Sequence, residues 1–518
     1  MSDAFFNKYR NKIITSQNLT RKIKRIRAKK KVAMCHGVFD VVHPGHVRHL
    51  AYVKSKADIL IVSITSDKFI NKGVYRPHVP QLIRASNLAA FEMVDYVIID
   101  NNKEPLSNIL KIKPNFYAKG FEYSKSNMTP ETLKEMNILK KIGSKMIFTP
   151  GDVVYSSSKL IESLNPNIVF EKLYFLLKNN NLSFQKISKT IKSLKNFSIH
   201  VVGDTIIDKF TYTTLIGGQT KTPTLSLLRA SEKKFLGGAG LVALNIRATG
   251  AKVFFTTILG KDENAKFTKE ILLKNKIKLY SKSDSDRPTT EKNVIINQNH
   301  RILKIDTLEN KLIDKSSIKY IKNKISKIKT NAVVFSDFRH GIFNRDSIAE
   351  LTSAIPGKAI KVADSQVASR WGNIQDFKNF DLITPNEREA RFALADQDST
   401  VNALTEAIYS KNNYKNIILK LGSRGILSCD RSEMNPEKHL GFSLDSFAEH
   451  VIDPVGSGDA LLAYATLSYL ATNSLLIASI VGSIAAACSC EKDGNEPISL
   501  AEIESKLKII EKKMNFKK

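Results

Sequence analysis

The sequence has few cysteines: Cys35, Cys429, Cys488 and Cys490 are the only four among 518 residues. Cysteines at such uneven spacing do not make a disulfide framework, and the closely spaced pair near residue 490 has no second pair to complete a zinc site. We therefore expect a reducing, cytoplasmic environment. The first residues lack the charged-then-apolar order of a secretory signal, so the sequence predicts no export.

The chain also lacks a clear membrane-spanning segment. Residues 460–490 contain no Asp, Glu, Lys or Arg and exceed the roughly 20 residues that span a bilayer. However, Thr472-Asn473-Ser474 interrupts this segment with residues that cap helices, and small Ala and Ser residues are scattered through it. We expect two buried helices of a large core and no membrane span.

Acidic residues are in the minority: 50 Asp and Glu stand against 80 Lys and Arg, which gives a formal net charge of +30. Such an excess favours anionic partners, among them nucleotides, sugar phosphates, nucleic acid and membrane surfaces. The densest basic run, residues 21–31, has no interleaved aromatic residues for stacking on bases. We interpret residues 1–30 as a solvated helical lead-in and expect no nucleic acid partner.

The length favours two or more domains, because a single core stops growing at roughly 250 to 300 residues. Short apolar runs alternate with helical patterns, which is typical of parallel α/β sheets. The expected strands are residues 32–34, 59–64, 97–99 and 146–148 of a first series, and 198–202, 252–256, 332–335 and 416–420 of a second. We predict a lead-in over 1–30, domains over 31–165 and 197–518, and a helical linker over 166–196, weakest at 178–182.

Two histidines follow the first expected strand. His43 and His46 flank a Pro-Gly pair at the start of an expected helix, which places imidazoles beside free backbone amides and the positive end of the helix dipole. Gly37 and Asp40 lie alongside, and the whole pattern favours a phosphate site over a structural histidine. Zinc is the competing interpretation, but no cluster of Cys or carboxylates completes a ligand set.

Residues 30–165 resemble the HxGH family of nucleotidylyltransferases, especially those that act on sugar and polyol phosphates. The matches, in chain order, are Thr65-Ser66-Asp67, Lys72-Gly73, Arg76-Pro77, Pro80, Arg84, Lys119-Gly120 and Tyr155-Ser156-Ser157-Ser158. The resemblance implies a Rossmann-like fold. It also implies that His43 and His46 stabilise the charge that develops when a phosphate oxygen attacks a nucleotide α-phosphorus and pyrophosphate leaves.

The same resemblance implies which residues bind nucleotide and phosphate: Gly37, Phe39, Asp40, Lys72, Arg84, Lys119, Ser156, Ser157 and Ser158. The serine turn would meet the nucleotide phosphates through its hydroxyls and a helix N-terminus. Three serines stand where the family carries a serine and then threonines, which keeps the hydroxyl chemistry. The histidine motif does not read the base, so the nucleotidyl donor is ATP or CTP.

A second motif lies at residues 453–460, which read Asp-Pro-Val-Gly-Ser-Gly-Asp-Ala at an expected loop-to-helix junction. Gly456 and Gly458 let the backbone approach a phosphate closely, and the helix start supplies oriented amides. Asp459 is placed to accept a proton from an attacking hydroxyl. The spacing differs from a Walker A loop, which needs Gly-Lys-Ser/Thr, and it indicates another kind of phosphoryl-transfer site.

Residues 197–515 resemble the ribokinase-like (PfkB) carbohydrate kinases. The resemblance implies a ribokinase-like α/β fold with Asp459 as general base and an anion hole formed by Gly456, Ser457 and Gly458. By the same resemblance, Asp204, Asp208, Gly237 and Gly238 bind the sugar, Asn386 and Glu389 are associated with Mg²⁺ and phosphate, and Lys420 and Gly422 lie on the nucleotide side. Mg²⁺ would bridge the phosphates of ATP, the phosphoryl donor.

The whole chain resembles the bifunctional heptose-phosphate kinase and heptose-1-phosphate adenylyltransferase family of lipopolysaccharide precursor synthesis. Residues 287–292, Arg-Pro-Thr-Thr-Glu-Lys, followed by Arg301 and Asp306, are similar to its kinase half. In that family the kinase comes first, whereas here the transferase does. Leu241 replaces a usual sugar-contacting Asn, and His340 and Gln366 replace usual lysines, so the heptose assignment is weaker than the kinase assignment.

Together these resemblances predict a bifunctional transferase that binds sugar phosphates and nucleoside triphosphates, with Mg²⁺ as cofactor and, by family resemblance, as a homo-oligomer. Two alternatives stay open. A polyol-phosphate or other cytidylyltransferase fused to a non-heptose sugar kinase fits the same motifs. Alternatively, one half is a non-catalytic scaffold, with the basic lead-in attached to RNA or to an anionic membrane.

Overall fold

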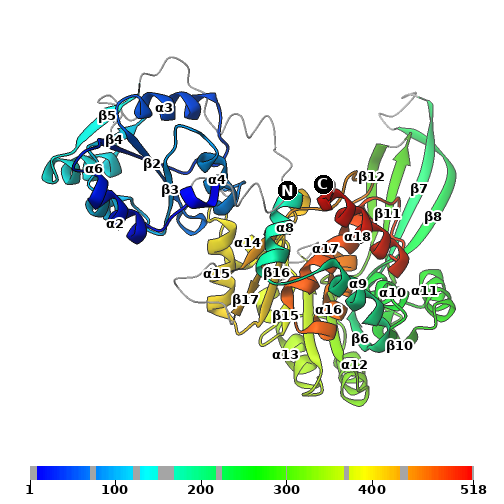
Figure 1. Cartoon of the computed structure of the whole chain (residues 1–518). Coiled ribbons are helices and arrows are strands. Elements are labelled where there is room, and N and C mark those ends of the chain that lie inside the picture. Colours follow the sequence, from blue (N-terminus) through cyan, green and yellow to red (C-terminus); the bar gives the residue numbers. More distant parts are fainter. Residues whose placement is uncertain are drawn as a thin grey trace. The chain divides into compact units, whose positions relative to one another are not determined.

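The computed structural model describes residues 9–70, 77–120, 129–149, 169–217, 225–298, 300–366, 373–431 and 441–515. Contacts among them divide the chain into two compact units, the first within residues 1–172 and the second comprising residues 173–513. Each unit contains sheets with helices packed on them (Figure 1). The predicted α/β class is thus confirmed for both halves of the chain.

The first unit is built on a five-stranded parallel sheet. Its elements are α2 (Ser16–Ile26), β1 (Val32–Gly37), α3 (Pro44–Lys54), β2 (Ile59–Thr65), α4 (Gln81–Ala89), β3 (Tyr96–Asp100), α5 (Leu106–Ile112), β4 (Phe116–Lys119), α6 (Pro130–Lys141) and β5 (Lys145–Phe148). The strand order is β3-β2-β1-β4-β5. Strand order reverses between β1 and β4, and open α/β sheets bind ligands at such a point, beyond the carboxyl ends of the strands.

Two apolar clusters sandwich this sheet. Helices α3 and α4 bury residues such as Leu50 and Leu88 on one face, and α2, α5 and α6 bury residues such as Ile23 and Leu139 on the other. The strands between them are apolar on both sides, and every residue of β2 is buried. This is the pattern of a parallel sheet covered on both faces.

The basic lead-in packs on the first unit through α2. Thr15 caps this helix by accepting a hydrogen bond from the Asn18 backbone N–H at 3.4 Å, and Leu19 and Ile23 are buried. Lys22 places its ammonium 4.8 Å from the centre of the Tyr96 ring. One face of α2 therefore belongs to the core, while most of its basic side chains stay exposed.

The second unit is larger. Its elements begin with α8 (Val169–Asn179), α9 (Phe184–Ser193), β6 (Ser198–Gly203), β7 (Thr205–Gly217), β8 (Ser226–Gly238), α10 (Ala239–Ala248), β9 (Lys252–Leu259), α11 (Glu263–Lys274), β10 (Lys278–Ser283), β11 (Thr290–Asn297), β12 (His300–Thr307) and α12 (Lys315–Lys327). They continue with β13 (Ala332–Asp337), α13 (Arg345–Ser353), β14 (Ile360–Ser365), β15 (Leu382–Ile383), α14 (Glu387–Leu394), α15 (Val401–Lys411), β16 (Asn416–Lys420), β17 (Ile426–Asp430), β18 (Phe442–Leu444), α16 (Ser457–Thr472), α17 (Leu475–Cys490) and α18 (Leu500–Asn515).

A nine-stranded sheet of order β10-β9-β6-β13-β14-β15-β16-β17-β18 forms the centre of this unit. Strands β10 to β16 in this order run parallel, and β17 and β18 are antiparallel at one edge. Helices α10, α16 and α17 pack together on one face, and α12, α13 and α15 bury the opposite face. The eight strands expected from the sequence all form, as β1, β2, β3, β5, β6, β9, β13 and β16.

The charge-free segment forms two buried helices, as predicted. Helices α16 and α17 are joined at Asn473, which adopts φ +51°, and Ser474 caps α17 by accepting a hydrogen bond from the Ile477 backbone N–H at 3.3 Å. Among the described residues, no helix has both the length and the apolar character that crossing a membrane requires.

A separate four-stranded sheet, of order β12-β11-β7-β8, was not predicted. Strands β7 and β8 have 13 residues each and run antiparallel, and β11 pairs parallel with β7. All of β12 is exposed. The sheet follows directly after β6, so β7 and β11 bring polar residues to the carboxyl edge of the large sheet.

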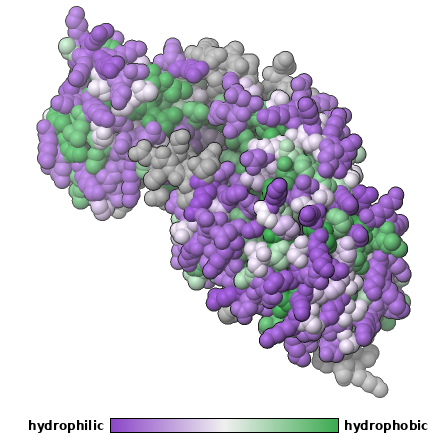
Figure 2. All heavy atoms as spheres, turned by 90° about the horizontal axis from the view of Figure 1, so that it is seen from below, coloured by the Kyte–Doolittle hydropathy of each residue, from purple (hydrophilic) through white to green (hydrophobic). Residues whose placement is uncertain are grey.

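Positive charge lies mainly on the surface. Figure 2 shows hydrophilic side chains over most of the visible face, with smaller apolar patches between them. Several lysines stand in the last turns of helices, for example Lys324 and Lys327 of α12, where the helix dipole favours cations. Part of the +30 charge is thus used in ordinary helix stabilisation.

Buried His200 makes the stability of the second unit depend on pH. The side chain lies on β6 with no exposed surface, and its Nε2 is 2.8 Å from Thr256 Oγ1. Burial lowers its pKa to about 3, so below about pH 6.5 the unfolded state binds a proton that the folded state excludes. The free energy of unfolding therefore falls as pH falls from about 6.5 towards 3, by about 2 kcal/mol between pH 6.5 and 5.

We expect His200→Gln to flatten this pH dependence by that amount. Chemical denaturation at pH 6.5 and 5, with hydrogen exchange of β6 peptides to identify the transition, measures it. His300→Gln, at the exposed start of β12, is the matched control and should keep the wild-type slope. An unchanged slope in His200→Gln contradicts the prediction.

Candidate active sites

The first candidate site lies at the N-terminus of α3, beyond the carboxyl end of β1. His43 is the N-cap residue, and its Nδ1 accepts a hydrogen bond from the Gly45 backbone N–H at 3.1 Å. The rings of His43 and His46 stack with centroids 3.9 Å apart and an interplanar angle of 31°. The two predicted histidines are thus brought together at the point where the strand order reverses.

The preceding loop orients this pair. Phe39 adopts φ +47°, and its ring centroid lies 5.0 Å from that of His46. A Cβ added at Gly37 would lie 3.1 Å from the Phe39 ring. Buried Asp40 accepts hydrogen bonds from the backbone N–H groups of His78 and Val79, at 3.0 and 2.8 Å. Gly37, Phe39 and Asp40 therefore shape the loop that carries the histidines.

Arg84 is fully buried beneath the same loops. Its guanidinium donates to the carbonyls of Val38, Thr65 and Val79 at 2.5, 2.9 and 2.9 Å, and it pairs with Asp67 at 2.6 Å. Arg84 therefore connects the segments that follow β1, follow β2 and precede α4. These contacts use four of the five N–H groups of a fully buried guanidinium, so the structure shows a structural role for Arg84, and the phosphate binding predicted from sequence stays a prediction.

Lys119 ends β4, the strand across the reversal point from β1. Its Nζ lies 2.5 Å from Glu135 Oε2 and 2.9 Å from Thr132 Oγ1. Tyr117 donates a hydrogen bond to Glu135 Oε1 at 3.2 Å. Burial raises the pKa of Glu135, and Lys119 opposes the shift. A bound phosphate would compete with Glu135 for the Lys119 ammonium.

Two further histidines support this site. His36 Nδ1 lies 2.9 Å from Ser63 Oγ and its Nε2 lies 3.1 Å from Thr65 Oγ1, which ties β1 to β2. His49 Nδ1 lies 3.2 Å from Thr149 Oγ1, and burial lowers its pKa to about 4. His49 was not assigned from the sequence. Its spacing of three residues from His46 puts the two histidines on one face of α3, and this spacing could have identified it. Predicted Lys72, Ser156, Ser157 and Ser158 lie outside the described residues.

The second candidate site lies at the N-terminus of α16. Gly456 adopts φ +81° as its N-cap, and the Ser457 hydroxyl donates to the Pro454 carbonyl at 2.8 Å. Asp459, in the first turn, is 7% exposed, and its Oδ1 has no hydrogen-bond partner in the structure. A Cβ added at Gly458 would lie 3.4 Å from Lys420 Nζ, so this ammonium lies against the glycine loop.

Lys420 lies among buried carboxylates at the carboxyl edge of the large sheet. Its Nζ is 2.8 Å from Asp364 Oδ1, which also accepts a hydrogen bond from the Thr384 hydroxyl at 2.9 Å. Burial raises the pKa of Asp459 far above its ordinary value; Asp364 adds to the shift and Lys420 opposes it. A carboxyl group with a raised pKa is suited to accept a proton from a substrate hydroxyl.

Asn386 and Glu389 form a capping box at the start of α14. The Glu389 carboxylate accepts hydrogen bonds from Asn386 N at 2.6 Å and Asn386 Nδ2 at 2.5 Å, while Glu389 N donates to Asn386 Oδ1 at 2.8 Å. Burial raises the pKa of Glu389 to about 8. These oxygens already accept hydrogen bonds from Asn386, so a Mg²⁺ ion held through water would leave the capping box intact. Within the described ranges no three His, Cys, Asp or Glu side chains form a metal-binding group.

The predicted sugar-binding residues lie across the edge from Asp459. Asp204 Oδ2 accepts hydrogen bonds from the backbone N–H groups of Phe338 and His340 at 3.1 and 3.2 Å. A Cβ added at Gly237 would lie 2.0 Å from Asp208 Oδ2, so only glycine fits beside this carboxylate. Gly238 adopts φ +57° and begins α10.

Comparisons with known proteins agree with this division. Residues 196–500 match the model of the pfkB family of carbohydrate kinases, which is more than half the chain. The chain belongs to the pfkB carbohydrate kinase family. Residues 34–173 match the cytidylyltransferase-like model, so the pfkB half is joined to a second domain of the type predicted.

Curated relatives carry the name bifunctional protein HldE. One from Sulfurimonas denitrificans is 27% identical over 319 residues, 61% of this chain and 65% of the relative. One from Campylobacter concisus is 37% identical over 122 residues, 23% of this chain and 26% of the relative. These alignments thus span less than two thirds of either relative's length.

A solved structure shows the fold of the pfkB half. Phosphofructokinase-2 from Escherichia coli, in complex with potassium, superposes with a TM-score of 0.51 and 16% identity, covering 61% of this chain and 99% of that protein. At this identity the likeness concerns the fold alone. The predicted ribokinase-like α/β architecture of the second domain is confirmed.

Some polar residues of the pfkB half were not assigned from sequence. Asn495 is 4% exposed, its Nδ2 donates to Asp208 Oδ2 at 2.5 Å, and its Oδ1 has no hydrogen-bond partner. This Oδ1 and Leu241 Cδ2 lie 3.0 and 2.7 Å from the Cβ position of Gly456. An amide therefore stands beside Leu241, the position that the family resemblance gives to Asn.

Strands β11 and β12 add two cations to this edge. Lys292 Nζ lies 5.5 Å from the centre of the Phe338 ring, and burial lowers its pKa. Arg301 Nη2 lies 2.6 Å from Oδ2 of Asp453, the first residue of the glycine loop motif. The motif at residues 287–292, which resembles the kinase half of the family, includes Lys292 and could have identified it. Predicted Gly422, with φ +63°, begins a 3₁₀ turn after β16.

Removing the Lys420 cation should strongly destabilise the pfkB half. Lys420→Met leaves Asp364 buried without its partner, for which we expect a loss of about 3–5 kcal/mol of unfolding free energy. Asp364→Asn added to Lys420→Met should recover most of this loss. Chemical denaturation of the full chain, with hydrogen exchange of β16 peptides, measures both values.

The pair Lys415–Asp381, with Nζ 2.5 Å from Oδ1 and a lysine side chain that is 70% exposed, supplies the control. Lys415→Met should cost no more than about 1 kcal/mol. Equal effects of Lys415→Met and Lys420→Met would contradict the assigned charge balance.

Proposed function

We propose that the chain is a bifunctional transferase of nucleotide-sugar synthesis. The pfkB half phosphorylates a sugar or sugar phosphate, heptose-like in class, with ATP. The first domain transfers a nucleotidyl group from ATP or CTP to a sugar 1-phosphate and releases pyrophosphate. The observation that supports this proposal is that each unit has a glycine-containing helix N-terminus with polar side chains, Asp459 in one unit and the stacked His43 and His46 in the other.

In the pfkB half, Asp459 accepts the proton of the attacking sugar hydroxyl. Its Oδ1 is unpaired, and its raised pKa favours proton uptake. Backbone amides at the start of α16, next to Gly456 and Gly458, face the transferred phosphoryl group and stabilise its charge. Mg²⁺, when bound with ATP, neutralises charge on its phosphates, and Asn386 and Glu389 would hold it through water.

In the first domain, His43 and His46 stabilise the charge on the nucleotide α-phosphate while a phosphate oxygen of the sugar attacks it. The hydrogen bond from Gly45 N to His43 Nδ1 orients this ring at the start of α3. The N-terminal amides of α3 add positive potential there. No covalent intermediate is needed, so positioning and electrostatics carry the reaction.

A polyol-phosphate or related cytidylyltransferase is the second candidate for the first domain. The match of residues 34–173 to the cytidylyltransferase-like model favours CTP. In the pfkB half, Leu241 and His340 depart from the family resemblance at the sugar side, which favours a sugar other than heptose. Either outcome keeps the two reactions and changes their substrates.

Selective variants separate the two reactions. We expect Asp459→Asn to lower sugar phosphorylation at least about a thousandfold and to leave nucleotidyl transfer intact, because its carboxylate acts only in the pfkB half. His46→Ala should do the reverse. Mass spectrometry of products from ATP or CTP, with heptoses, hexoses, polyols and their phosphates, measures both reactions in the full chain.

Lys12→Met and Lys266→Met, two substitutions outside both sites, serve as controls and should leave both activities unchanged. If the wild type consumes neither ATP nor CTP across the panel, the proposal is wrong. Loss of both activities in either site variant would contradict two independent sites. Salt-sensitive binding to RNA or anionic vesicles that persists in both site variants would instead favour the scaffold alternative.

Asn495 should matter for the sugar and not for ATP. Asn495→Ala removes the hydrogen bond to Asp208 and the unpaired Oδ1 near Gly456, so we expect the KM for the sugar to rise about ten- to a hundredfold with little change in the KM for ATP. Glu496→Gln, at the exposed neighbour, is the control. An equal rise in both KM values would contradict a role at the sugar.

A further inference from the structure

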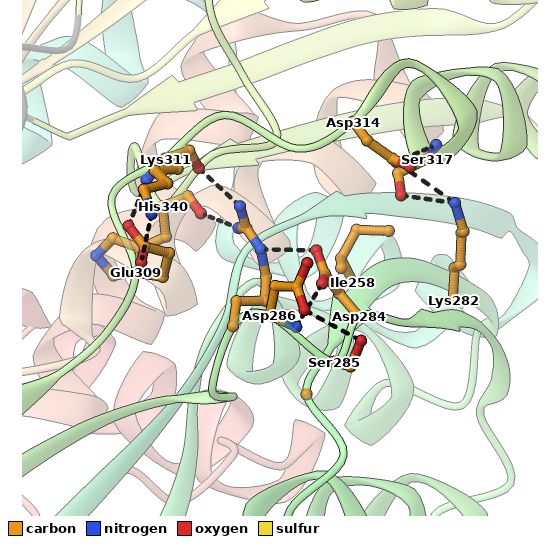
Figure 3. Close-up of polar contacts among 12 residues, drawn as sticks. Ile258, Lys282, Asp284, Ser285, Asp286, Glu309, Lys311, Asp314, Ser317 and His340 are labelled. Atoms are coloured by element: carbon orange, nitrogen blue, oxygen red, sulfur yellow. Dashed lines mark hydrogen bonds and ion pairs between the residues drawn. The ribbon is translucent and has the colours of Figure 1, made fainter.

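A small pocket beside Asp204 carries a histidine that the mechanism does not use. The pocket is lined by Thr205, Thr290, Glu309 and His340, among others. Figure 3 shows His340, Glu309 and Lys311 grouped together. The pocket therefore adjoins the carboxylate that the family resemblance assigns to sugar binding.

The imidazole of His340 is buried without partners. His340 is 4% exposed, and its Nδ1 and Nε2 are both buried with no hydrogen bond. Buried polar atoms in folded proteins nearly always have a hydrogen-bond partner. Two unpaired nitrogens on one ring that lines a pocket point to a ligand that supplies the missing bonds.

The backbone that carries this ring is held on both sides. His340 N donates to Asp204 Oδ2 at 3.2 Å, and Arg287 Nη1 donates to the His340 carbonyl at 2.8 Å. The same guanidinium donates to the Lys311 carbonyl at 2.7 Å and pairs with Asp284 at 3.2 Å (Figure 3). The loop is thus held before any ligand binds, which favours selective recognition.

A close contact that only glycine allows also holds the loop around His340. Gly341 adopts φ +113°, and a Cβ added there would lie 2.5 Å from the Lys311 carbonyl oxygen and 2.7 Å from Arg287 Nη1. Arg339, on the other side of His340, adopts φ +60° and pairs with Asp337 at 2.8 Å. The backbone on both sides of His340 is therefore restricted.

The chemistry of the ring selects among ligands. Burial lowers the pKa of His340, and Asp204 opposes the shift, so the ring is neutral near pH 7. A neutral imidazole offers one donor and one acceptor. A sugar hydroxyl also donates and accepts, so one hydroxyl can pair with either ring nitrogen and two neighbouring hydroxyls can pair with both, whereas a phosphate dianion only accepts.

We propose that His340 recognises a hydroxyl group of the sugar, distinct from the one that reacts, and makes the pfkB half prefer a sugar over the same sugar phosphorylated at that hydroxyl. This rests on the proposed kinase function and narrows its substrate class from sugars and sugar phosphates to the sugars. A lysine at this position, as the family resemblance has, would offer donors only and favour phosphate.

The test compares substrate pairs, each a free hexose or heptose and its terminal monophosphate, with ATP and the full chain. We expect the wild type to show a kcat/KM about tenfold or more higher for the free sugar. His340→Lys should lower that ratio about tenfold or more, mainly through KM, while His340→Gln, which keeps a donor and an acceptor, should preserve it. His300→Gln is the matched control.

Because the ratio compares two substrates on one protein, partial unfolding of a variant cancels. A tenfold wild-type preference for the phosphorylated sugar, or an unchanged ratio in His340→Lys, overturns this inference and leaves the kinase function standing. If no sugar or sugar phosphate is phosphorylated, the proposed kinase function fails, and the inference fails with it.

Discussion

The ammonium of Lys420 is the charge on which the pfkB half depends. It lies 2.8 Å from Asp364 and acts on the buried carboxyls of Glu389 and Asp459. These residues come from β14, β16, α14 and α16, which are far apart in sequence and meet at the carboxyl edge of one sheet. Without this cation, the pKa values of Glu389 and Asp459 would rise further, and an ionised Asp364 would destabilise the fold.

The balance between Lys420 and the buried carboxyls explains how one edge of the sheet can be stable and still hold a reactive group. Glu389 uses its oxygens to cap α14, and Asp364 holds Lys420 and Thr384. Asp459 keeps an oxygen unpaired above the glycine loop. Structural carboxylates are therefore satisfied by the protein, whereas the proposed base is left for a substrate proton.

The two units arrange a helix N-terminus in different ways. Each places a helix N-terminus beyond the carboxyl end of a parallel strand, where backbone amides favour anions. In the first unit a histidine caps the helix and stacks on a second histidine. In the pfkB half a glycine with φ +81° begins the helix and an aspartate follows. In the proposed function, the first arrangement stabilises charge on phosphate, and the second also provides a base.

Much of this organisation could be predicted from the sequence. Apolar runs located eight strands, the break at Thr472-Asn473-Ser474 separated two buried helices, and the histidine and glycine motifs marked both helix N-termini. These are local signals, in which residues close in sequence determine the structure.

The rest depended on contacts that are distant in sequence. Asn495 lies 287 residues from Asp208, and Arg301 lies 152 residues from Asp453. No local pattern links such pairs. Arg84 and Lys119 were predicted from motifs to bind phosphate, but nothing local showed that buried carbonyls and carboxylates already hold them. The strands of the smaller sheet lacked a clear apolar alternation and were missed for that reason.

The pH dependence of kcat/KM for sugar phosphorylation tests the central charge balance most directly, in the wild type and in Lys420→Gln at pH values where circular dichroism shows both folded. Lys420 lowers the pKa of the Asp459 carboxyl, so its removal should shift the acidic limb of the profile to higher pH by about one unit or more. An acidic limb at the same pH in both proteins would contradict the assignment of Asp459 as a base held in balance by Lys420.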